Sequence, residues 1–325
     1  MVAATIRDMM AVERLNELAF RGIHPPEPQG PNEHFAYGGC VFAQSISAAY
    51  QTIPADPKYF LYSLLGNILS PALTKELITY RIQDLRTTKT FCTCKIDAWQ
   101  KHKGVERLIM VLIMDTHVKE PSTEVYSVAP LGVYEPTSPE DQLASLDHYA
   151  KTAPELIPKY KAAFPVSLRY FDYKIVPDAF STSVALGISP LVKTLGVDVS
   201  PVSKTSATWV RCKEPLQSHV EHCSALAFLG DATLAFLPAL LTQRTLYEIG
   251  VAATLDFSLR FFTPEVNLND WIFHEHVTER AGYGRSFSKG SMWDRNKNLL
   301  VSMHQQCIFR VAAHETSAEK DKSRL

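Results

Sequence analysis

An aspartate stands in the middle of a stretch of apolar residues that is predicted to be helical. On a helix, the neighbours of Asp231 three and four positions away are all apolar, namely Ala227, Phe228, Leu234 and Ala235. An ionised carboxylate on such a face is costly unless it is hydrogen-bonded, so it needs partners or a raised pKa. Asp231 is therefore either a structural carboxylate that caps a neighbouring loop or a group that takes part in proton-transfer chemistry.

A glutamine interrupts the apolar face of the last predicted strand. Alternation along 299–310 puts Gln305 on one face with Met303 and Cys307, and puts His304 on the other, where a surface or interface role is expected. The Gln305 face is predicted to meet the helix that carries Asp231. Since a buried amide needs hydrogen-bond partners, and a carboxylate is a good one, the two residues form either a structural pair or part of a site.

Thr254 lies close to these residues only if its strand is irregular. In the predicted strand 252–262 the apolar row is Leu255, Phe257, Leu259 and Phe261, which leaves Thr254 on the opposite face. A bulge or an irregular strand start would turn its hydroxyl toward the same pocket. The pattern alone does not select Thr254.

The elements that must position these residues occur twice along the chain. The first half contains a predicted helix at 38–50 and strands at 59–69, 78–85, 90–99 and 108–114. The second half contains a strand at 208–210, a helix at 223–241 and strands at 252–262, 271–279, 286–293 and 299–310. The order predicts an α+β fold built from two repeats, each with a long helix packed on an antiparallel sheet.

The predicted domain organisation follows from this repeat. Residues 1–129 form an N-terminal unit, and residues 166–314 form a C-terminal unit that carries Asp231, Thr254 and Gln305. The segment 130–165 is rich in proline and predicts a linker with one short helix near 143–149. Residues 315–325 lack apolar periodicity and predict a flexible tail.

Composition excludes several classes of function. The chain has 325 residues, with 33 Lys and Arg against 34 Asp and Glu, for a net charge of −1. A nucleic-acid binder or a polybasic membrane anchor would need clustered positive charge. The longest apolar run, 108–114, is too short to span a bilayer, and the N-terminus lacks the apolar core of an export signal, so an intracellular protein is expected.

Known motifs for other chemistries are missing from the sequence. Cys92 and Cys94 share a strand face, but no second pair completes a zinc site, so no metal and no cofactor are predicted. The sequence has no Gly-x-Ser-x-Gly elbow, P-loop, dinucleotide fingerprint or zincin helix. Covalent catalysis by serine or cysteine and nucleotide-driven chemistry are therefore not indicated.

The chain resembles the acyl-CoA thioesterase II family, TesB-like double-hotdog hydrolases of bacteria and peroxisomes. The segments that carry the resemblance are 35–39 with Gln44, 85–91, 229–238, 253–256, 285–287 and the strand of Gln305. The resemblance extends from about Met9 to Val311 and includes both repeats.

This resemblance implies a fold, a reaction and a set of site residues. It implies a double hotdog that hydrolyses acyl-CoA to a free acid and CoA, in fatty-acid or specialised acyl metabolism. It also implies that Asp231, Thr254 and Gln305 hold and orient the attacking water. Pairing of hotdog sheets implies a homodimer or a larger homo-oligomer.

The sequence departs from the family pattern in the first repeat. Leu65 and Ser70 stand where the family commonly has histidine and arginine, and Cys40 stands where it commonly has glutamine. Two alternative functions are kept, an enoyl-CoA hydratase and an acyl-CoA-binding protein without catalytic activity. A hydratase would need a histidine converging on the same acyl group as Asp231, and no such spacing is evident.

The phosphates of CoA require local cations in a chain without overall positive charge. Arg86, Lys89, Arg285 and Lys289, which lie beside matched turns of the two repeats, are predicted to bind them. No membrane span or nucleic-acid partner is expected.

The last three residues resemble a targeting signal. Ser323, Arg324 and Leu325 form a variant of the Ser-Lys-Leu peroxisomal address, which implies recognition by the import receptor and a peroxisomal location, with a cytoplasmic location as the alternative.

Overall fold

The computed structural model describes residues 2–30, 34–56, 58–131, 138–152, 154–176, 179, 200–242 and 244–312. The predicted tail, with Ser323, Arg324 and Leu325, lies outside the described residues, as does part of the predicted linker. The peroxisomal location and the domain boundaries stay predictions.

Helices and strands account for most of the described chain. The helices are α1 (Ile6–Met10), α2 (Gly38–Tyr50), α3 (Ser145–Thr152), α4 (Ile157–Ala163), α5 (Pro165–Tyr170), α6 (His219–Gly230) and α7 (Leu237–Leu241). The strands of the first half are β1 (Val12–Arg14), β2 (Ala19–Gly22), β3 (Tyr59–Ile68), β4 (Ile78–Thr87), β5 (Phe91–His102) and β6 (Val105–Val118). Those of the second half are β7 (Phe171–Ile175), β8 (Ser206–Cys212), β9 (Ile249–Phe261), β10 (Ile272–Gly282), β11 (Arg285–Trp293) and β12 (Leu299–Val311).

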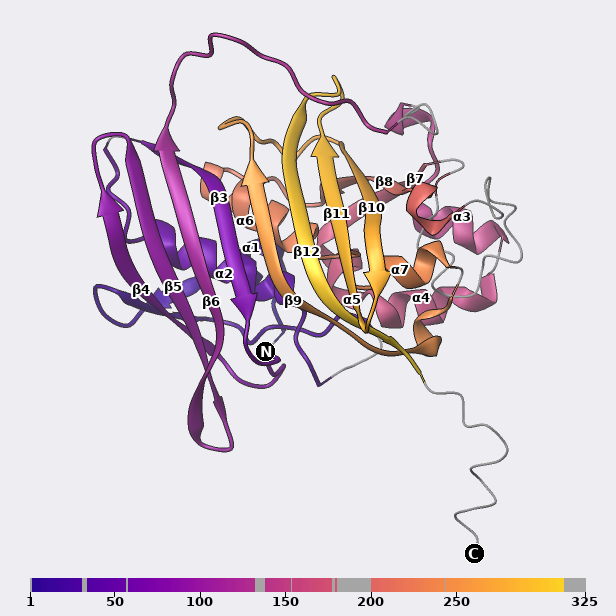
Figure 1. The fold of residues 1–325 in the computed structure, drawn as a ribbon, viewed down its shortest axis with the longest axis horizontal. Coiled ribbons are helices and arrows are strands. Elements are labelled where there is room, and N and C mark those ends of the chain that lie inside the picture. The colour runs from indigo at the N-terminus through magenta and orange to yellow at the C-terminus, as the bar shows by residue number, and fades with distance from the viewer. Residues whose placement is uncertain are drawn as a thin grey trace, which may run out of the picture.

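The strands of the described chain form a single sheet of 12 strands. Their order is β1-β2-β4-β5-β6-β3-β9-β12-β11-β10-β8-β7, so the order is mirrored about the contact between β3 and β9. These two strands pair antiparallel, with Ser63 opposite Arg260 and Asn67 opposite Asp256. Figure 1 shows α2 and α6 together behind this sheet. The predicted α+β architecture of two helix-on-sheet repeats is confirmed.

Irregularities of the two half-sheets also repeat. A β-bulge leaves Tyr62 of β3 and Leu255 of β9 without a directly paired residue. A second pair of bulges lies at Ile109 of β6 and Leu300 of β12. Because a bulge turns the residues on either side of it relative to the sheet, matched bulges place matched side chains in the two repeats.

The second long helix is shorter than predicted. The sequence predicts one helix over 223–241, but α6 ends at Gly230, Asp231 is its C-cap, and α7 starts at Leu237. Pro238 explains the break, since proline lacks the amide hydrogen of a helix interior and its ring collides with the carbonyl of the preceding turn. It is tolerated here because it stands in the first turn of α7.

Other elements were missed or underestimated by the sequence reasoning. The short strands β1, β2 and β7 were not predicted, and β5 and β6 extend farther into their hairpin than expected. The region predicted as a linker with one short helix contains α3 and α4, which are followed directly by α5.

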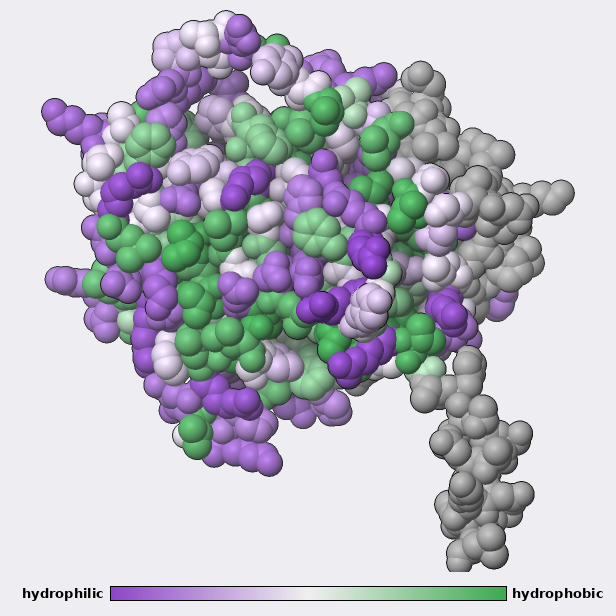
Figure 2. All heavy atoms as spheres, in the orientation of Figure 1, coloured by the Kyte–Doolittle hydropathy of each residue, from purple (hydrophilic) through white to green (hydrophobic). Residues whose placement is uncertain are grey.

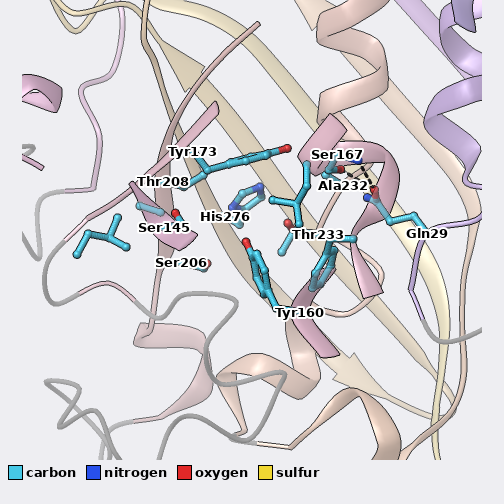
Figure 3. A pocket seen from close by; sticks show the side chains of 14 residues that line it. Gln29, Ser145, Tyr160, Ser167, Tyr173, Ser206, Thr208, Ala232, Thr233 and His276 are labelled. Atoms are coloured by element: carbon cyan, nitrogen blue, oxygen red, sulfur yellow. Dashed lines mark hydrogen bonds between the residues drawn. The ribbon is translucent and has the colours of Figure 1, made fainter. Parts of the chain in front are cut away.

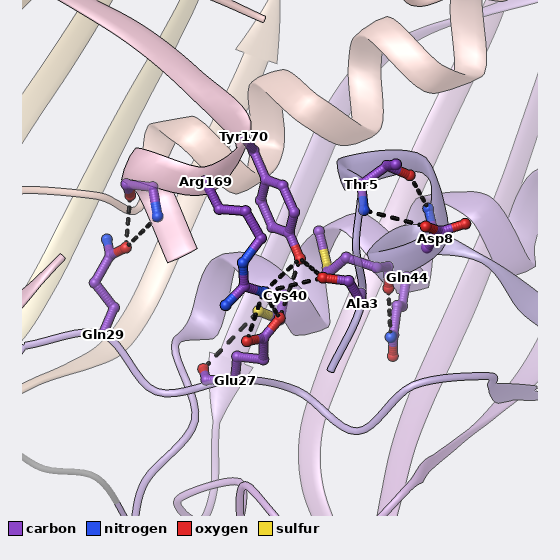
Figure 4. Close-up of polar contacts among 11 residues, drawn as sticks. Ala3, Thr5, Asp8, Glu27, Gln29, Cys40, Gln44, Arg169 and Tyr170 are labelled. Carbon is purple, nitrogen blue, oxygen red and sulfur yellow. Dashed lines mark hydrogen bonds and ion pairs between the residues drawn. The ribbon is translucent and has the colours of Figure 1, made fainter. Parts of the chain in front are cut away.

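An ion pair ties the region before α2 to the second repeat. Glu27 is buried, and its two carboxylate oxygens accept hydrogen bonds of 2.7 and 2.8 Å from Arg169 Nη1. The Tyr170 hydroxyl donates to the same carboxylate at 3.0 Å (Figure 4). Since Arg169 and Tyr170 belong to α5, this cluster fixes the loop that leads into α2.

The face of the sheet opposite the helices has a mixed character. Figure 2 shows hydrophobic and hydrophilic side chains interleaved over this outer face. Leu65 and Ile113 are paired there across β3 and β6 and are only half-buried. The predicted oligomer stays untested. Within the described residues, the helices are too short or too polar to span a membrane.

Candidate functional site

A bulge brings Thr254 to the face of the sheet that meets the helices. In β9, Phe257 lies opposite Gln305, but beyond the bulge at Leu255 it is Thr254 that lies opposite Cys307. Side chains directly opposite each other on antiparallel strands share a face, so Thr254 joins the face of Gln305 and Cys307. The irregular strand start that the sequence left as a condition is present.

Asp231 receives hydrogen bonds from three different elements. Gln305 Nε2 donates to Asp231 Oδ1 at 2.6 Å, and Thr254 Oγ1 lies 3.3 Å from the same oxygen. The backbone N–H of Gly39 donates to Oδ2 at 2.9 Å. The structure therefore places Asp231, Thr254 and Gln305 together, as the sequence and the resemblance predict.

The hydroxyl of Thr254 has a choice of acceptors. It lies 3.4 Å from Gln305 Oε1 as well as 3.3 Å from Asp231 Oδ1, and both distances are long for a hydroxyl donor. Thr254 is half-buried, whereas Gln305 is fully buried. The cluster is thus anchored from inside by Gln305 and reaches solvent at Thr254.

Burial raises the pKa of Asp231. Desolvation is the largest cause, and the hydrogen bonds from Gln305, Gly39 and Thr254 act against it by stabilising the ionised form. The side chain is 8% exposed. A raised pKa together with donors that hold the carboxylate in place suits a group that accepts a proton from a bound molecule.

The N-terminus of α2 adds positive electrostatic potential to this site. Gly39 is in the first turn of α2, where backbone N–H groups point outward and the helix dipole favours negative charge. A side chain at Gly38 would put its Cβ 2.8 Å from Asp231 Oδ2. Glycine at this position is therefore what allows the carboxylate to approach the helix so closely.

Gln44, the large polar side chain of α2, has a structural role. Its Nε2 donates to the carbonyl of Met9 at 2.7 Å, and its Oε1 accepts from the Tyr80 hydroxyl at 2.8 Å. It is fully buried. Gln44 thus holds α2 against the N-terminal segment and is not among the groups that contact Asp231.

The four predicted CoA-binding cations are not brought to this site. Lys289 pairs with His304 and Arg285 pairs with Ile308, positions that alternate with Gln305 and Cys307 and so lie on the outer face. Arg86 donates to Thr93 on the same outer face. Lys89 lies in the turn between β4 and β5. Arg86, Arg285 and Lys289 therefore do not lie on the sheet face of Asp231.

A small cavity begins beside the turn that follows Asp231. It has a volume of about 60 Å³ and is lined by Ala232 and Thr233, which follow Asp231, and by His276 of β10. Figure 3 shows His276 between Tyr160 and Tyr173. Burial lowers the pKa of His276 to about 4, which leaves its ring neutral at neutral pH. The cavity has a mixed lining, with hydroxyl groups among apolar side chains, and is large enough to hold water.

Two contributors to the site are not predicted by the sequence. The amide of Gly39 and the space left by Gly38 become visible only when α2 and α6 are packed together. Their signal in the sequence was the glycine pair at the start of a helix, which indicated a helix start but not what would approach it.

The residues that depart from the family pattern lie in different places. Leu65 is on the outer face, paired with Ser258 and Ile113. Cys40 is buried, with its thiol 4.0 Å from the Glu27 carbonyl. Ser70 lines a groove beyond the end of β3.

Two family models match the chain. The model described as the acyl-CoA thioesterase N-terminal domain matches residues 25–116, and the model described as the acyl-CoA thioesterase C-terminal domain matches residues 165–309. Together they match more than half of the chain.

Proteins named as acyl-CoA thioesterases align over nearly the whole length. "Acyl-CoA thioesterase 2" of Haemophilus influenzae is 25% identical over 304 residues, which are 93% of this chain and 96% of that protein. "Acyl-coenzyme A thioesterase 8" of Mus musculus is 24% identical over 94% of this chain and 89% of that protein.

Solved structures share the fold. The acyl-CoA thioesterase II TesB2 from Mycobacterium marinum superposes with a TM-score of 0.66 at 21% identity, covering 95% of this chain and 99% of that one. A hot dog fold protein from Alicyclobacillus acidocaldarius also gives 0.66, at 15% identity, over 94% of this chain and 98% of that one. The predicted double hotdog is confirmed.

Proposed function

Because the chain belongs to the TesB-like acyl-CoA thioesterase II family, we propose that it hydrolyses acyl-CoA to a free carboxylic acid and CoA at Asp231. The observation that carries the proposal is the buried carboxylate held by Gln305 and Thr254 against the first turn of α2. CoA is part of the substrate, and no cofactor is needed for this reaction.

In this mechanism the carboxylate acts on water. Asp231 accepts a proton from a water molecule, or orients it, while Thr254 and Gln305 fix its position, and the oxygen attacks the thioester carbonyl. The C–S bond then breaks, the free acid is released, and the proton taken from water passes to the sulfur of CoA. The raised pKa of Asp231 makes it a better proton acceptor than an exposed aspartate. The half-buried Thr254 gives the water a route of approach.

The start of α2 supplies a second requirement of the reaction. Attack on the thioester puts negative charge on its carbonyl oxygen, which backbone N–H groups at a helix N-terminus stabilise. The N–H of Gly39 is already bonded to Asp231, whereas the described residues supply no acceptor for the N–H of Gly38. We assign the oxyanion to the Gly38 amide.

The alternatives receive less support from the site. An enoyl-CoA hydratase would need a histidine that converges on the acyl group with Asp231. The groups that donate to the carboxylate are Gln305, Thr254 and Gly39, with no histidine among them in the described chain. A protein that only binds acyl-CoA would have no need of a carboxylate with a raised pKa.

Thiol release from a panel of short, medium, long and branched acyl-CoA substrates tests this function. Release of CoA with equimolar free acid is expected for at least one chain length. Loss of absorbance of an enoyl thioester without thiol release would instead identify a hydratase. Saturable binding without turnover for every member of the panel would identify a binding protein and overturn the proposal.

A further inference from the structure

A groove on the first repeat lies on the same side of the sheet as Asp231. It is lined by Ser70, which follows β3, by His102 and Arg107 of the β5–β6 hairpin, and by Phe35, which precedes α2. Its volume is about 100 Å³, which suits phosphate groups, whereas a nucleoside would have to lie outside the groove at its rim.

Alternation shows that His102 and Arg107 of this groove face the helices. His102 lies two positions beyond Gln100 and four beyond Ala98, and both of these residues are buried on the helix side of β5. Residues at this spacing on a strand share a face. Arg107 is directly opposite Gln100 across the hairpin. His102 and Arg107 therefore share the sheet face of Asp231, unlike Arg86, Arg285 and Lys289.

The groove and the Asp231 site also lie at the same end of the sheet. Asn67 near the end of β3 pairs with Asp256, two residues from Thr254. The chain after β3 continues beside β6, since the N–H groups of Leu69 and Ser70 both donate to the carbonyl of Ile109. Figure 1 shows the end of β3, the start of β9 and the β5–β6 hairpin at this lower end.

The lateral separation fits the length of CoA. In the strand order, β6 is two strands and β5 is three strands from β9. At about 4.8 Å per strand, the groove lies roughly 10 to 14 Å to the side of Thr254. The extended pantetheine arm, which separates the sulfur of CoA from its diphosphate, spans a distance of this order.

Charge in the groove is available for an anion. Within the described residues Arg107 forms no ion pair, and its guanidinium is always charged. The neighbouring Glu106 does not cancel this charge, because it is paired with Arg81 at 2.8 Å. Lys101 and Lys103 in the same hairpin add to the positive potential.

The floor of the groove is held rigidly. Gln100 accepts from the N–H of Leu73 at 2.7 Å and donates to the carbonyls of Leu73 and Glu76. Phe35 forms a bridge with Leu73, and its side chain remains 46% exposed. A half-exposed aromatic ring beside a cation offers a stacking surface for a base.

We propose that this groove binds the diphosphate end of the CoA moiety through Arg107 and His102, with the Phe35 ring stacked against the adenine, while the thioester lies at Asp231. The inference rests on the proposed hydrolysis of acyl-CoA. It assigns CoA recognition to the first repeat and catalysis to the second.

Arg107→Ala tests the groove when acyl-CoA is compared with the N-acetylcysteamine thioester of the same acid, which has the same reacting bond but no phosphates. KM for acyl-CoA is expected to rise about tenfold, because a charge-assisted hydrogen bond is lost. The kcat for acyl-CoA and the KM for the short thioester should not change. Arg107→Lys should restore part of the loss, since the charge returns.

Two matched variants make the result decisive. Lys95→Ala removes an outer-face cation, which is bonded to Asp97, and should leave both KM values unchanged. Lys289→Ala tests the rival outer-face position. Three results would overturn the proposed CoA site in this groove. Arg107→Ala could raise KM equally for both thioesters, it could raise KM for neither, or the increase could be confined to Lys289→Ala.

The adenine contact is tested separately with Phe35→Ala. Affinity for acyl-CoA should fall while affinity for acyl-phosphopantetheine, which lacks the adenosine, stays the same. If both substrates weaken equally, the stacking assignment is wrong.

Failure of the groove can be told apart from failure of the hydrolytic function. If the wild-type protein hydrolyses neither thioester, the proposed function fails. Calorimetric titration with free CoA then tests the groove alone, and weaker binding by Arg107→Ala than by Lys95→Ala still supports it. Equal binding by the two variants refutes it.

Discussion

The two ends of the β3–β9 strand pair have matching backbone irregularities, but their side chains differ in polarity. Thr254 immediately precedes the bulge of β9, and Leu61 immediately precedes the bulge of β3. Gln305 lies five residues after the bulge at Leu300, as Met114 does after the bulge at Ile109. The repeat thus offers the same two positions twice, with polar residues in one copy and apolar residues in the other.

The helix ends differ in the same way. Asp231 is the C-cap of α6, and the corresponding C-cap of α2 is Gln51, which is exposed. At the first-repeat site the α6 residue His219 accepts from the backbone N–H of Leu61 at 3.3 Å, whereas at the second Gly39 of α2 donates to Asp231. Since the first repeat folds the same way without an acid, the polar set is not a requirement of the fold.

The strongest test of this difference is to remove the acid. Asp231→Asn should lower kcat by about 10²- to 10⁴-fold, the usual contribution of a positioned general base. Gln51→Asn places the same residue at the equivalent C-cap, where the side chain is exposed, and should have no effect. Thiol release measures both. An Asn variant that is as fast as wild type would show that the acid is only structural.

Gln305→Met gives the second repeat the residue type that Met114 provides at the equivalent position of the first repeat. It removes the 2.6 Å hydrogen bond to Asp231 and should lower kcat roughly 10- to 100-fold, the range that the loss of a charge-assisted bond implies. That bond lowers the pKa of Asp231. Its loss should therefore move the acid limb of the pH profile of kcat to higher pH.

The reverse substitution sharpens the comparison. Met114→Gln places an amide at a fully buried site that has no carboxylate, so it should destabilise the protein by about 1 to 3 kcal/mol without adding a second active site. Denaturation and thiol release report the two effects.

For Gln305→Met, an unchanged pH profile of kcat would contradict the role given to the Gln305 amide.

Thr254→Val is expected to have a smaller effect. The Thr254 hydroxyl is 3.3 Å from Asp231 Oδ1, a long and weak contact, so kcat should fall only about 3- to 10-fold. Leu61→Thr at the matching position should leave kcat unchanged. A loss as large as that of Asp231→Asn would mean that Thr254 has a more direct part in the reaction.

The sequence predicted the repeated order of elements and the acid Asp231, but it did not predict the bulge and the helix packing that bring the site residues together. Hydrophobic periodicity was sufficient for the α+β pattern because each unit repeats the same order of elements. Asp231 and Gln305 stood out because polar groups on apolar faces need partners. Thr254 depended on a bulge, which shifts the alternation by one residue and leaves no clear signature in a single sequence.

Longer-range packing explains what could not be predicted. The amide of Gly39 reaches Asp231 only because α2 and α6, far apart in sequence, pack against each other. Likewise, three of the cations predicted from turns, Arg86, Arg285 and Lys289, lie on the outer face, since their positions alternate with inward-facing ones. Turn position does not determine which face of a sheet a side chain occupies, whereas register does.

The smallest expected effect is on stability and follows from the raised pKa of Asp231. Between the carboxyl pKa of the unfolded chain and the higher pKa of the folded state, the folded state binds more protons, so wild-type stability falls as pH rises through this window. Asp231→Asn removes that dependence. Its amide fits the site if Oδ1 accepts from Gly39 and the Gln305 amide flips to accept from Nδ2. At neutral pH the Asn variant should melt at the wild-type temperature or about 1 to 3 °C above it, with the difference shrinking below the window. Scanning calorimetry of both proteins across pH measures this difference in melting temperature, and Gln51→Asn is the control in which no ionisable group is changed.

A variant that melts well below wild type at neutral pH would show that the ionised carboxylate stabilises the fold. The difference between the Asp231 site and the acid-free first repeat would then be structural and not catalytic.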